Sequence, residues 1–353
     1  MRIPLNVARY AVSVIAAVAL AFPVLAQNVL AQEVVAQNVV AQDDPLPSWN
    51  AGVNKSAIIA FVRSATDASN SNYVPPAERI ATFDNDGTLW VEHPMYTQLA
   101  FALDRLKTLA PEHPEWKTAQ PFKAALEGDM RTLGALGEEG LLKIVMETHA
   151  GMSTADFEKI VSGWIAEARH PRFDRPYTDL TYQPMVEVIH YLQENEFKTF
   201  IVSGGGIEFM RPWTARVYNI PPENVVGSSI KTEYKIINGK HELMRLGEIS
   251  FIDDKAGKPV GINAHIGLRP IAAFGNSDGD AQMLQWTAEG PRPHLMMLVF
   301  HDDSAREYAY GPAGGLPDTA FGTFSPWLME EAQKGGWHVI SMKNDWSTIF
   351  SPP

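Results

Sequence analysis

Two aspartates, Asp84 and Asp86, are separated by a single residue and are followed by Gly87 and Thr88. Neighbouring carboxylates can divide the chemistry of a displacement reaction, because one attacks as a nucleophile while the other passes a proton to the leaving oxygen and takes one from water. The apolar run 79–83 precedes the pair, which predicts a strand that ends at the sheet edge where open α/β folds bind ligands. An ordinary turn is the alternative interpretation of this segment taken alone, since Asp, Asn and Gly are common turn residues.

Two further segments carry groups that can bind an anion. In the first, Ser203, Gly204 and Gly205 follow an apolar run, and a hydroxyl beside exposed main-chain N–H groups can hold a phosphate. A flexible turn is the simpler interpretation of the glycines. In the second, Lys255 and Lys258 stand in a loop rich in Gly and Pro; either lysine can clamp a phosphate, or both can belong to a solvated surface cluster.

An acid-rich turn follows another apolar run, residues 270–274. It contains Asn276, Asp278 and Asp280, which supply amide and carboxylate oxygens. If these oxygens lie beside Asp84, they form the kind of ligand set that a hard cation such as Mg²⁺ prefers.

A scaffold must bring these segments to one edge. Strand-like runs alternate with helical patterns along the chain, which is typical of an α/β fold. The Asn238-Gly239 pair predicts a hairpin over residues 234–242. We expect the other strands at residues 79–84, 198–203, 224–228, 270–275, 294–300 and 337–342.

The stretch from about Trp90 to Asp179 contains no convincing strand. Apolar residues recur there at helical spacing in 99–106 and 157–168, and the sequence from Ser153 to Asp156 resembles a capping box. Prolines at both ends of the stretch limit helix continuation. We therefore expect a helical lid over the site.

Four motifs in this order resemble the haloacid dehalogenase superfamily, most closely its phosphoserine-phosphatase-like branch, from Arg79 to about Leu284. The motifs are Asp84-x-Asp86-Gly87-Thr88, Val202-Ser203-Gly204-Gly205, a lysine of the 255–258 loop, and Gly275-Asn276-x-x-x-Asp280. The resemblance implies a doubly wound, mainly parallel α/β sheet with an inserted helical cap. We expect the core at residues 48–92 and 180–353 and the cap at 93–179.

The resemblance also implies roles for the matched residues. Asp84 would attack phosphorus to form an aspartyl-phosphate, and Asp86 would protonate the leaving alcohol and then activate water. Ser203 would bind the phosphoryl group. Lys258, preferred to Lys255 because it stands in Gly-Lys-Pro, would neutralise the phosphoryl charge and hold Asp84.

Further matched positions complete the phosphate and metal sites that the resemblance implies. The remaining phosphate-binding positions are Thr88, Gly204 and Gly205. The ligands of Mg²⁺ would be Asp84, the main-chain carbonyl of Asp86, Asn276 and Asp280. Asn276 departs from the pattern because an acid is usual there, and a neutral oxygen should weaken Mg²⁺ binding. The substrate-recognising Glu of phosphoserine phosphatases is also missing, since His93 stands at its position and Glu92 one place earlier.

The charge and composition of the chain limit the classes of partner that it can bind. The formal net charge of −12 argues against a general nucleic-acid or anionic-membrane binder, since both need basic surface. A chain that is 45% hydrophobic and 20% charged is typical of a soluble globular protein. We expect a small phosphorylated substrate, no nucleic acid and no membrane contact after export; the sequence does not predict an oligomeric state.

The first 47 residues are expected to lie outside the folded part. Residues 1–26 resemble an export signal, with Arg2 and Arg9 before an apolar run and small residues before Gln27. A retained membrane anchor is the alternative. Residues 27–47 form a low-complexity, five-residue repeat that we interpret as a linker. The chain contains no cysteine, so no disulfide is expected. From the export signal we expect a periplasmic protein.

The sequence thus predicts an exported, Mg²⁺-dependent phosphatase that hydrolyses a small phosphomonoester through an aspartyl-phosphate. One alternative comes from Gly275-x-Ser277-x-Gly279, which matches the nucleophile elbow of an α/β-hydrolase, with Asp303 or Asp318 and then His338 in triad order. A second alternative, motivated by Asn276, is a non-catalytic binding protein on the same scaffold.

Overall fold

The computed structural model describes residues 44–291 and 293–351. From Leu46 onward, the described residues form one compact unit. The predicted export signal and most of the predicted linker lie outside the described residues. Within the described part, none of the helices combines the length and the apolar character needed to cross a membrane.

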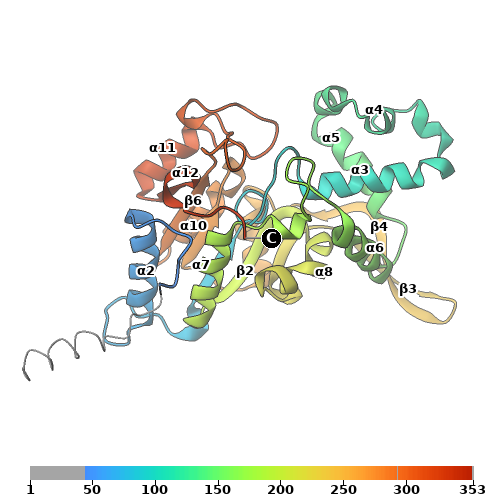
Figure 1. The fold of residues 1–353 in the computed structure, drawn as a ribbon. Helices are drawn as coiled ribbons and strands as arrows, with labels where there is room; N and C mark the ends of the chain where they lie inside the picture. The colour runs from blue at the N-terminus through green and yellow to red at the C-terminus, as the bar shows by residue number, and fades with distance from the viewer. Residues whose placement is uncertain (1–43, 292, 352–353) are drawn as a thin grey trace, which may run out of the picture. The chain divides into compact units, whose positions relative to one another are not determined.

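The described residues form a sheet of seven strands in the order β4-β3-β2-β1-β5-β6-β7 (Figure 1). The strands are β1 Ile80–Phe83, β2 Lys198–Gly206, β3 Val225–Ile237, β4 Lys240–Phe251, β5 Ala272–Gly275, β6 Leu295–Phe300 and β7 His338–Ser341. Neighbouring strands are parallel except β3 and β4, which are antiparallel. The predicted mainly parallel α/β fold is therefore confirmed.

Alternating side chains of the strands enter two separate cores. On β2, Ile201 belongs to one cluster and Val202 to the other, because successive side chains of a strand point to opposite faces. Helices α2 Val53–Thr66, α7 Gln183–Glu194 and α8 Ile207–Tyr218 cover the first face. Helices α9 Gly257–His265, α10 Ala281–Ala288 and α11 Pro326–Gly335 cover the second. This double cover explains why the strands contain near-continuous apolar runs.

Strand order reverses at β1, which lies between β2 and β5. The chain leaves β1 for β2 and β3 on one side and later returns to β5 on the other. Segments that follow β1, β2 and β5 therefore meet at one carboxyl edge, the usual ligand site of such sheets. Asp84 and Asn276 directly follow β1 and β5, and Ser203 lies near the carboxyl end of β2.

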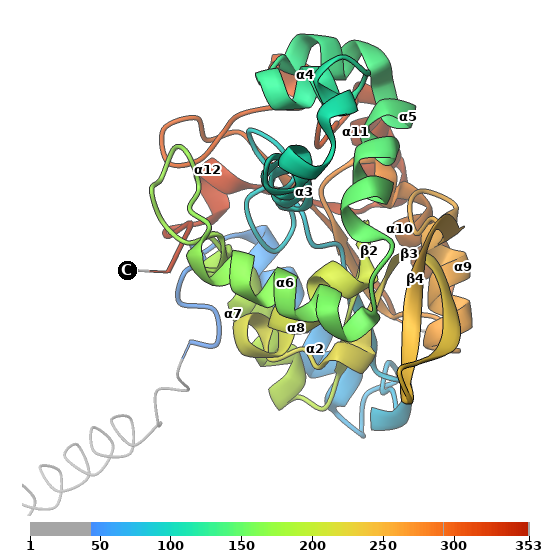
Figure 2. The same cartoon turned by 90° about the vertical axis from the view of Figure 1, so that its right-hand side faces the viewer.

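Four α-helices lie between β1 and α7: α3 Thr97–Leu109, α4 Phe122–Glu127, α5 Met130–His149 and α6 Thr154–Glu167. Helices α3, α4 and α5 gather at one end, whereas α6 lies beside α8 (Figure 2). The first three share a core that includes Leu106, Phe122 and Ile144. Ser153 caps α6 by accepting a hydrogen bond from the Asp156 N–H, but the Asp156 carboxylate accepts from the Ser153 hydroxyl, so the contact differs from a reciprocal capping box.

Three strands, β2, β3 and β4, extend well beyond the ranges predicted from the sequence. β2 continues through Gly206, with a register shift against β3 between Ser203 and Gly206, so the glycines extend the strand instead of forming a turn. The predicted hairpin turn is found at Asn238-Gly239, where both residues have positive φ. The two strands of the hairpin are much longer than predicted. Their outer residues are mostly exposed, so the sequence there lacks the alternating apolar pattern from which a strand is predicted.

Candidate active site

Lys258 lies between two buried carboxylates at the carboxyl edge of the sheet. Its Nζ atom donates hydrogen bonds to Asp84 Oδ1 at 2.7 Å, to Asp280 Oδ1 at 2.5 Å and to the Val202 carbonyl at 2.9 Å. The side chain of Lys258 is buried because it stands in the first turn of α9, against the sheet. Burial opposes its charge, but the two carboxylates outweigh this effect and raise the pKa of Lys258. The lysine is therefore a permanent cation beside Asp84.

Asp84 begins the turn after β1, and its N–H donates to the Phe274 carbonyl at 2.9 Å. Burial and the nearby Asp280 raise the pKa of Asp84, whereas Lys258 acts in the opposite direction. Ionisation of Asp84 thus depends on positive charge in the site. A carboxylate held in this way can act as a nucleophile.

Asp86 is fixed on one side by a tryptophan. Trp90 Nε1 donates to Asp86 Oδ1 at 2.8 Å, and the Trp90 ring stacks on Trp213 with centroids 4.4 Å apart. Burial raises the pKa of Asp86 to about 6. A carboxyl group with a pKa near neutrality is suited to accept and return a proton.

The glycine segment faces Asp86. The Ser203 hydroxyl accepts a hydrogen bond from the Gly205 N–H at 3.1 Å, and a Cβ placed on Gly205 would lie 3.7 Å from Asp86 Oδ2. The next N–H, that of Gly206, donates to Gln98 Oε1 at 2.7 Å. Gly205 therefore lies close to Asp86, and the main-chain N–H groups of Gly205 and Gly206 bond to side chains in this structure.

Asn276 joins the first and fourth motifs. Its Oδ1 accepts from the Thr88 hydroxyl at 3.1 Å, and its Nδ2 donates to Glu92 Oε1 at 2.7 Å. Tyr310 also donates to Glu92 Oε1 at 2.7 Å. Gly87, at φ 75°, leaves room for this contact, because a Cβ there would lie 2.1 Å from Asn276 Nδ2. A carboxylate thus lies directly beside the position where the family pattern has an acid.

Asp280 has both oxygens engaged. Oδ1 accepts from Lys258, and Oδ2 accepts from the N–H groups of Asn276 and Ser277 at 2.9 and 3.0 Å. Asp280 therefore orients the lysine and the turn after β5. Its predicted role as a metal ligand remains a prediction.

A cavity of about 320 Å³ collects most of the predicted residues. Asp84, Asp86, Ser203, Gly204, Gly205 and Lys258 all line it. Thr88, Asn276 and Asp280 lie behind this wall and are buried. The structure distinguishes the two lysines, because Lys255 is exposed whereas Lys258 points into the site.

Sequence reasoning missed several residues that line the same cavity. Glu92 was noted only as displaced from a family position, and Tyr96, Gln98, Asp254 and Phe321 were not considered. The eight-residue offset of Glu92 from Asp84 was a usable signal. No sequence pattern indicates Gln98, because its contact depends on the path of the chain from Asp86 to α3.

The residues of the alternative serine-hydrolase triad bind other partners. The Ser277 hydroxyl accepts from the Gly279 N–H at 3.2 Å, whereas His338 Nδ1 lies 3.2 Å from Asn54 Oδ1 and Asp303 accepts from Arg306 Nε at 2.5 Å. Ser277 lines the cavity, but Asp303, Asp318 and His338 are not among its lining residues. The geometry therefore does not support this alternative.

The oxygen donors of the site are chemically suited to a hard cation. Asp84 and Glu92 supply carboxylates, Asn276 an amide oxygen and Asp86 a main-chain carbonyl. Among the described residues, no group of three or more His, Asp or Glu side chains is arranged to hold a metal ion.

Comparison with known proteins supports the fold. A family model described as haloacid dehalogenase-like hydrolase matches residues 81–285. A conserved, functionally unknown protein from Anaerococcus prevotii DSM 20548 is 16% identical, with a TM-score of 0.52, over 85% of this chain and 96% of that chain. No curated protein matches the chain.

Two other solved structures match this chain with lower TM-scores. A protein of unknown function from Bordetella pertussis Tohama I is 17% identical, with a TM-score of 0.46, over 74% of this chain and 98% of that one. A phosphoserine phosphohydrolase-like protein from Francisella tularensis subsp. tularensis SCHU S4 is 16% identical, with a TM-score of 0.34, over 64% and 88%.

Proposed function

The chain belongs to the haloacid dehalogenase-like hydrolase family, and we propose that it is an exported, Mg²⁺-dependent phosphatase that hydrolyses a small phosphomonoester through an aspartyl-phosphate. One observation carries the proposal. Lys258 holds Asp84 at 2.7 Å in a cavity that Asp86 and Ser203 also line. A nucleophile, a fixed cation, a proton carrier and a hydroxyl donor are the groups that phosphoryl transfer requires.

In the proposed first step, a carboxylate oxygen of Asp84 forms a bond to phosphorus as the bond from phosphorus to the alcohol oxygen breaks. Asp86 gives its proton to that oxygen, and the alcohol leaves. In the second step, Asp86 takes a proton from water, which attacks phosphorus and breaks the bond to Asp84. Inorganic phosphate leaves, and both carboxylates return to their starting states.

The surrounding groups stabilise charge during both steps. Lys258 remains protonated and offsets negative charge near Asp84, while the Ser203 hydroxyl can donate to a phosphoryl oxygen. The N–H of Gly205 now bonds to Ser203 Oγ, and a bound phosphoryl group can compete for that N–H. Such preorganised donors contribute most where water is excluded, as in this buried site.

Mg²⁺ would be held by Asp84, the Asp86 carbonyl and Asn276, and we propose that Glu92 supplies the charge that Asn276 lacks. The cation would add positive charge near the phosphoryl oxygens. Support comes from the 2.7 Å contact between Asn276 and Glu92 and from the place of Glu92 in the cavity wall. Burial raises the pKa of Glu92, so its carboxylate would carry the charge expected of an acid at position 276 when a cation is bound beside it.

Phosphate release from a panel of phosphomonoesters, with and without chelator, tests the activity. We expect release that needs added Mg²⁺ and that orthovanadate inhibits. If no ester releases phosphate at any Mg²⁺ concentration, the phosphatase proposal is wrong, and the non-catalytic alternative becomes the better explanation.

Export is a separate part of the proposal. It rests on the charged and apolar pattern of residues 1–26. N-terminal sequencing of the protein isolated from the cells that naturally produce it should find that the mature chain starts near Gln27. A mature protein that still begins at Met1 would favour the membrane-anchor alternative.

A further inference from the structure

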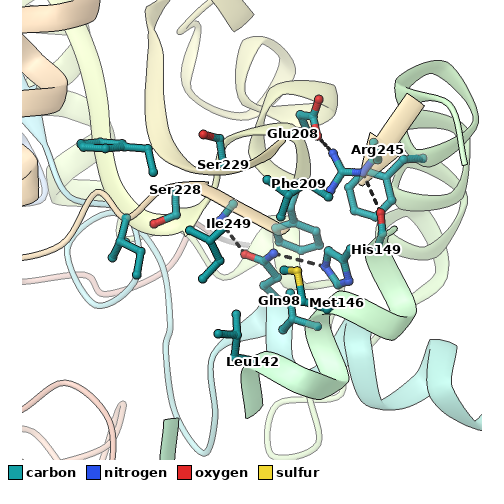
Figure 3. A pocket seen from close by; sticks show the side chains of 17 residues that line it. Gln98, Leu142, Met146, His149, Glu208, Phe209, Ser228, Ser229, Arg245 and Ile249 are labelled. Atoms are coloured by element: carbon teal, nitrogen blue, oxygen red, sulfur yellow. Dashed lines mark hydrogen bonds and ion pairs between the residues drawn. The ribbon is translucent and has the colours of Figure 1, made fainter. Parts of the chain in front are cut away.

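A second cavity has a volume of about 220 Å³, and Figure 3 shows the residues that line it. It adjoins the catalytic cavity. Four residues line both cavities: Gln98, Val145, Gly204 and Ile252. Gln98 lies at the boundary, because its Oε1 accepts from the Gly206 N–H and its Nε2 lies 3.2 Å from His149 Nε2. A group attached to a phosphate in the first cavity can therefore extend past Gln98 into the second.

The walls of the second cavity are mainly apolar and aromatic. They come from α5, α6, α8 and β4, and include Leu142, Met146, Phe157, Phe209, Ile249 and Phe251. Phenylalanine rings and a methionine sulfur make favourable contacts with aromatic groups. Such a lining favours a ring system over a polar chain.

The charged residues of this cavity compensate one another. Arg245 pairs with Glu208 and donates to the His149 carbonyl at 2.7 Å (Figure 3). The Arg245 guanidinium also lies 3.8 Å from the centroid of the Phe157 ring. Burial, together with Arg245 and Arg105, lowers the pKa of His149 to about 3, so the imidazole is neutral. A charged ligand would find no free counterion here and would lose its hydration.

We propose that this second cavity binds the alcohol part of the substrate, and that this alcohol is uncharged and carries one or two aromatic rings. The inference rests on the phosphatase activity proposed above. The volume of the second cavity, about 220 Å³, is sufficient for an aromatic ring, because an apolar cavity of about 150 Å³ accepts benzene. A charged amino-acid ester such as phosphoserine does not fit this chemistry.

Two esters of matched reactivity test the proposal on the full chain with Mg²⁺. Ethyl phosphate and 2-(1-naphthyl)ethyl phosphate both release a primary alcohol and differ only in the ring. We expect kcat/KM to be at least roughly 30-fold higher for the naphthyl ester, since small apolar groups in a pocket are worth about 10- to 200-fold. Phosphoserine should be no better than ethyl phosphate.

Filling the cavity should remove the preference. In Leu142→Trp the ratio of the two kcat/KM values should fall toward one, whereas Met130→Trp, at a 40% exposed site on the same helix, should keep it. If Leu142→Trp does not fold by circular dichroism, Ser229→Phe fills the cavity from the hairpin side. A preference that survives both fillings would overturn the proposal.

Binding separates failure of the cavity proposal from failure of the activity. The free alcohol 2-(1-naphthyl)ethanol should bind the wild type in calorimetry, and Leu142→Trp should lose this binding. If neither ester is hydrolysed but the alcohol binds in this way, the phosphatase proposal fails and the cavity proposal stands. If the two esters are hydrolysed with equal kcat/KM and the alcohol does not bind, only the cavity proposal fails.

Discussion

The Nζ atom of Lys258 lies 2.7 Å from Oδ1 of Asp84, and both side chains are buried. The two residues come from different segments, the turn after β1 and the first turn of α9. Their contact places one positive charge where the proposed nucleophile must remain ionised. Because Asp280 shares the same ammonium, one lysine compensates two buried acids, and its removal has consequences for stability as well as for catalysis.

Lys258→Met should destabilise the protein by about 3 to 5 kcal/mol at pH 8, because it leaves two buried carboxylates without their cation. Urea denaturation followed by circular dichroism measures the change. Lys255→Met is the matched control: the lysine is exposed, so its free energy of unfolding should change by no more than about 0.5 kcal/mol. Equal effects of the two substitutions would contradict the proposed role of Lys258.

Asp84→Asn should lower kcat at least roughly 10³-fold, because the amide cannot form the covalent intermediate. The fold should persist, since an amide oxygen can still accept from Lys258. Phosphate release measures the loss, and mass spectrometry of acid-quenched wild type should find phosphate on the peptide that contains Asp84. Asp67→Asn, an exposed acid outside the cavity, serves as the control. Turnover in Asp84→Asn close to that of the wild type would exclude the mechanism.

The sequence predicted which segments meet, because carboxyl ends of parallel strands share one edge. For this reason Asp84 and Asn276 were placed correctly after β1 and β5, whereas Ser203 lies inside β2, which continues through Gly206. The choice between Lys255 and Lys258 needed the start of α9, which turns one lysine inward and leaves the other exposed. Glu92 and Gln98 reach the site through an irregular segment, and such a path depends on tertiary contacts that no local pattern encodes.

Asp253→Asn should flatten the pH dependence of stability. Asp253 is fully buried, and burial raises its pKa to about 7. The folded state therefore holds this proton where the unfolded state has lost it, so the free energy of unfolding should fall as the pH rises from about 4 to 7. The total fall is about 4 kcal/mol for a shift of this size.

Urea denaturation of wild type and Asp253→Asn at pH 5 and pH 8 isolates this contribution. The stability of the variant relative to wild type should be higher at pH 8 than at pH 5. Denaturation curves that shift in parallel with pH in the two proteins would show that Asp253 titrates normally in the folded state.

Exchange of two side chains tests whether Glu92 supplies the charge that Asn276 lacks. Glu92→Gln should weaken Mg²⁺ binding about tenfold or more, because it removes a carboxylate beside the site. Asn276→Asp alone should destabilise the protein, since it replaces the donor 2.7 Å from Glu92 with a like charge. The double variant Glu92→Gln/Asn276→Asp restores one acid and one amide, so its affinity should recover. Calorimetric titration with Mg²⁺, without substrate, measures the Mg²⁺ affinity of the wild type, the two single variants and the double variant. If the double variant binds no better than Glu92→Gln, the two positions are not interchangeable carriers of charge, and Glu92 has only a structural role.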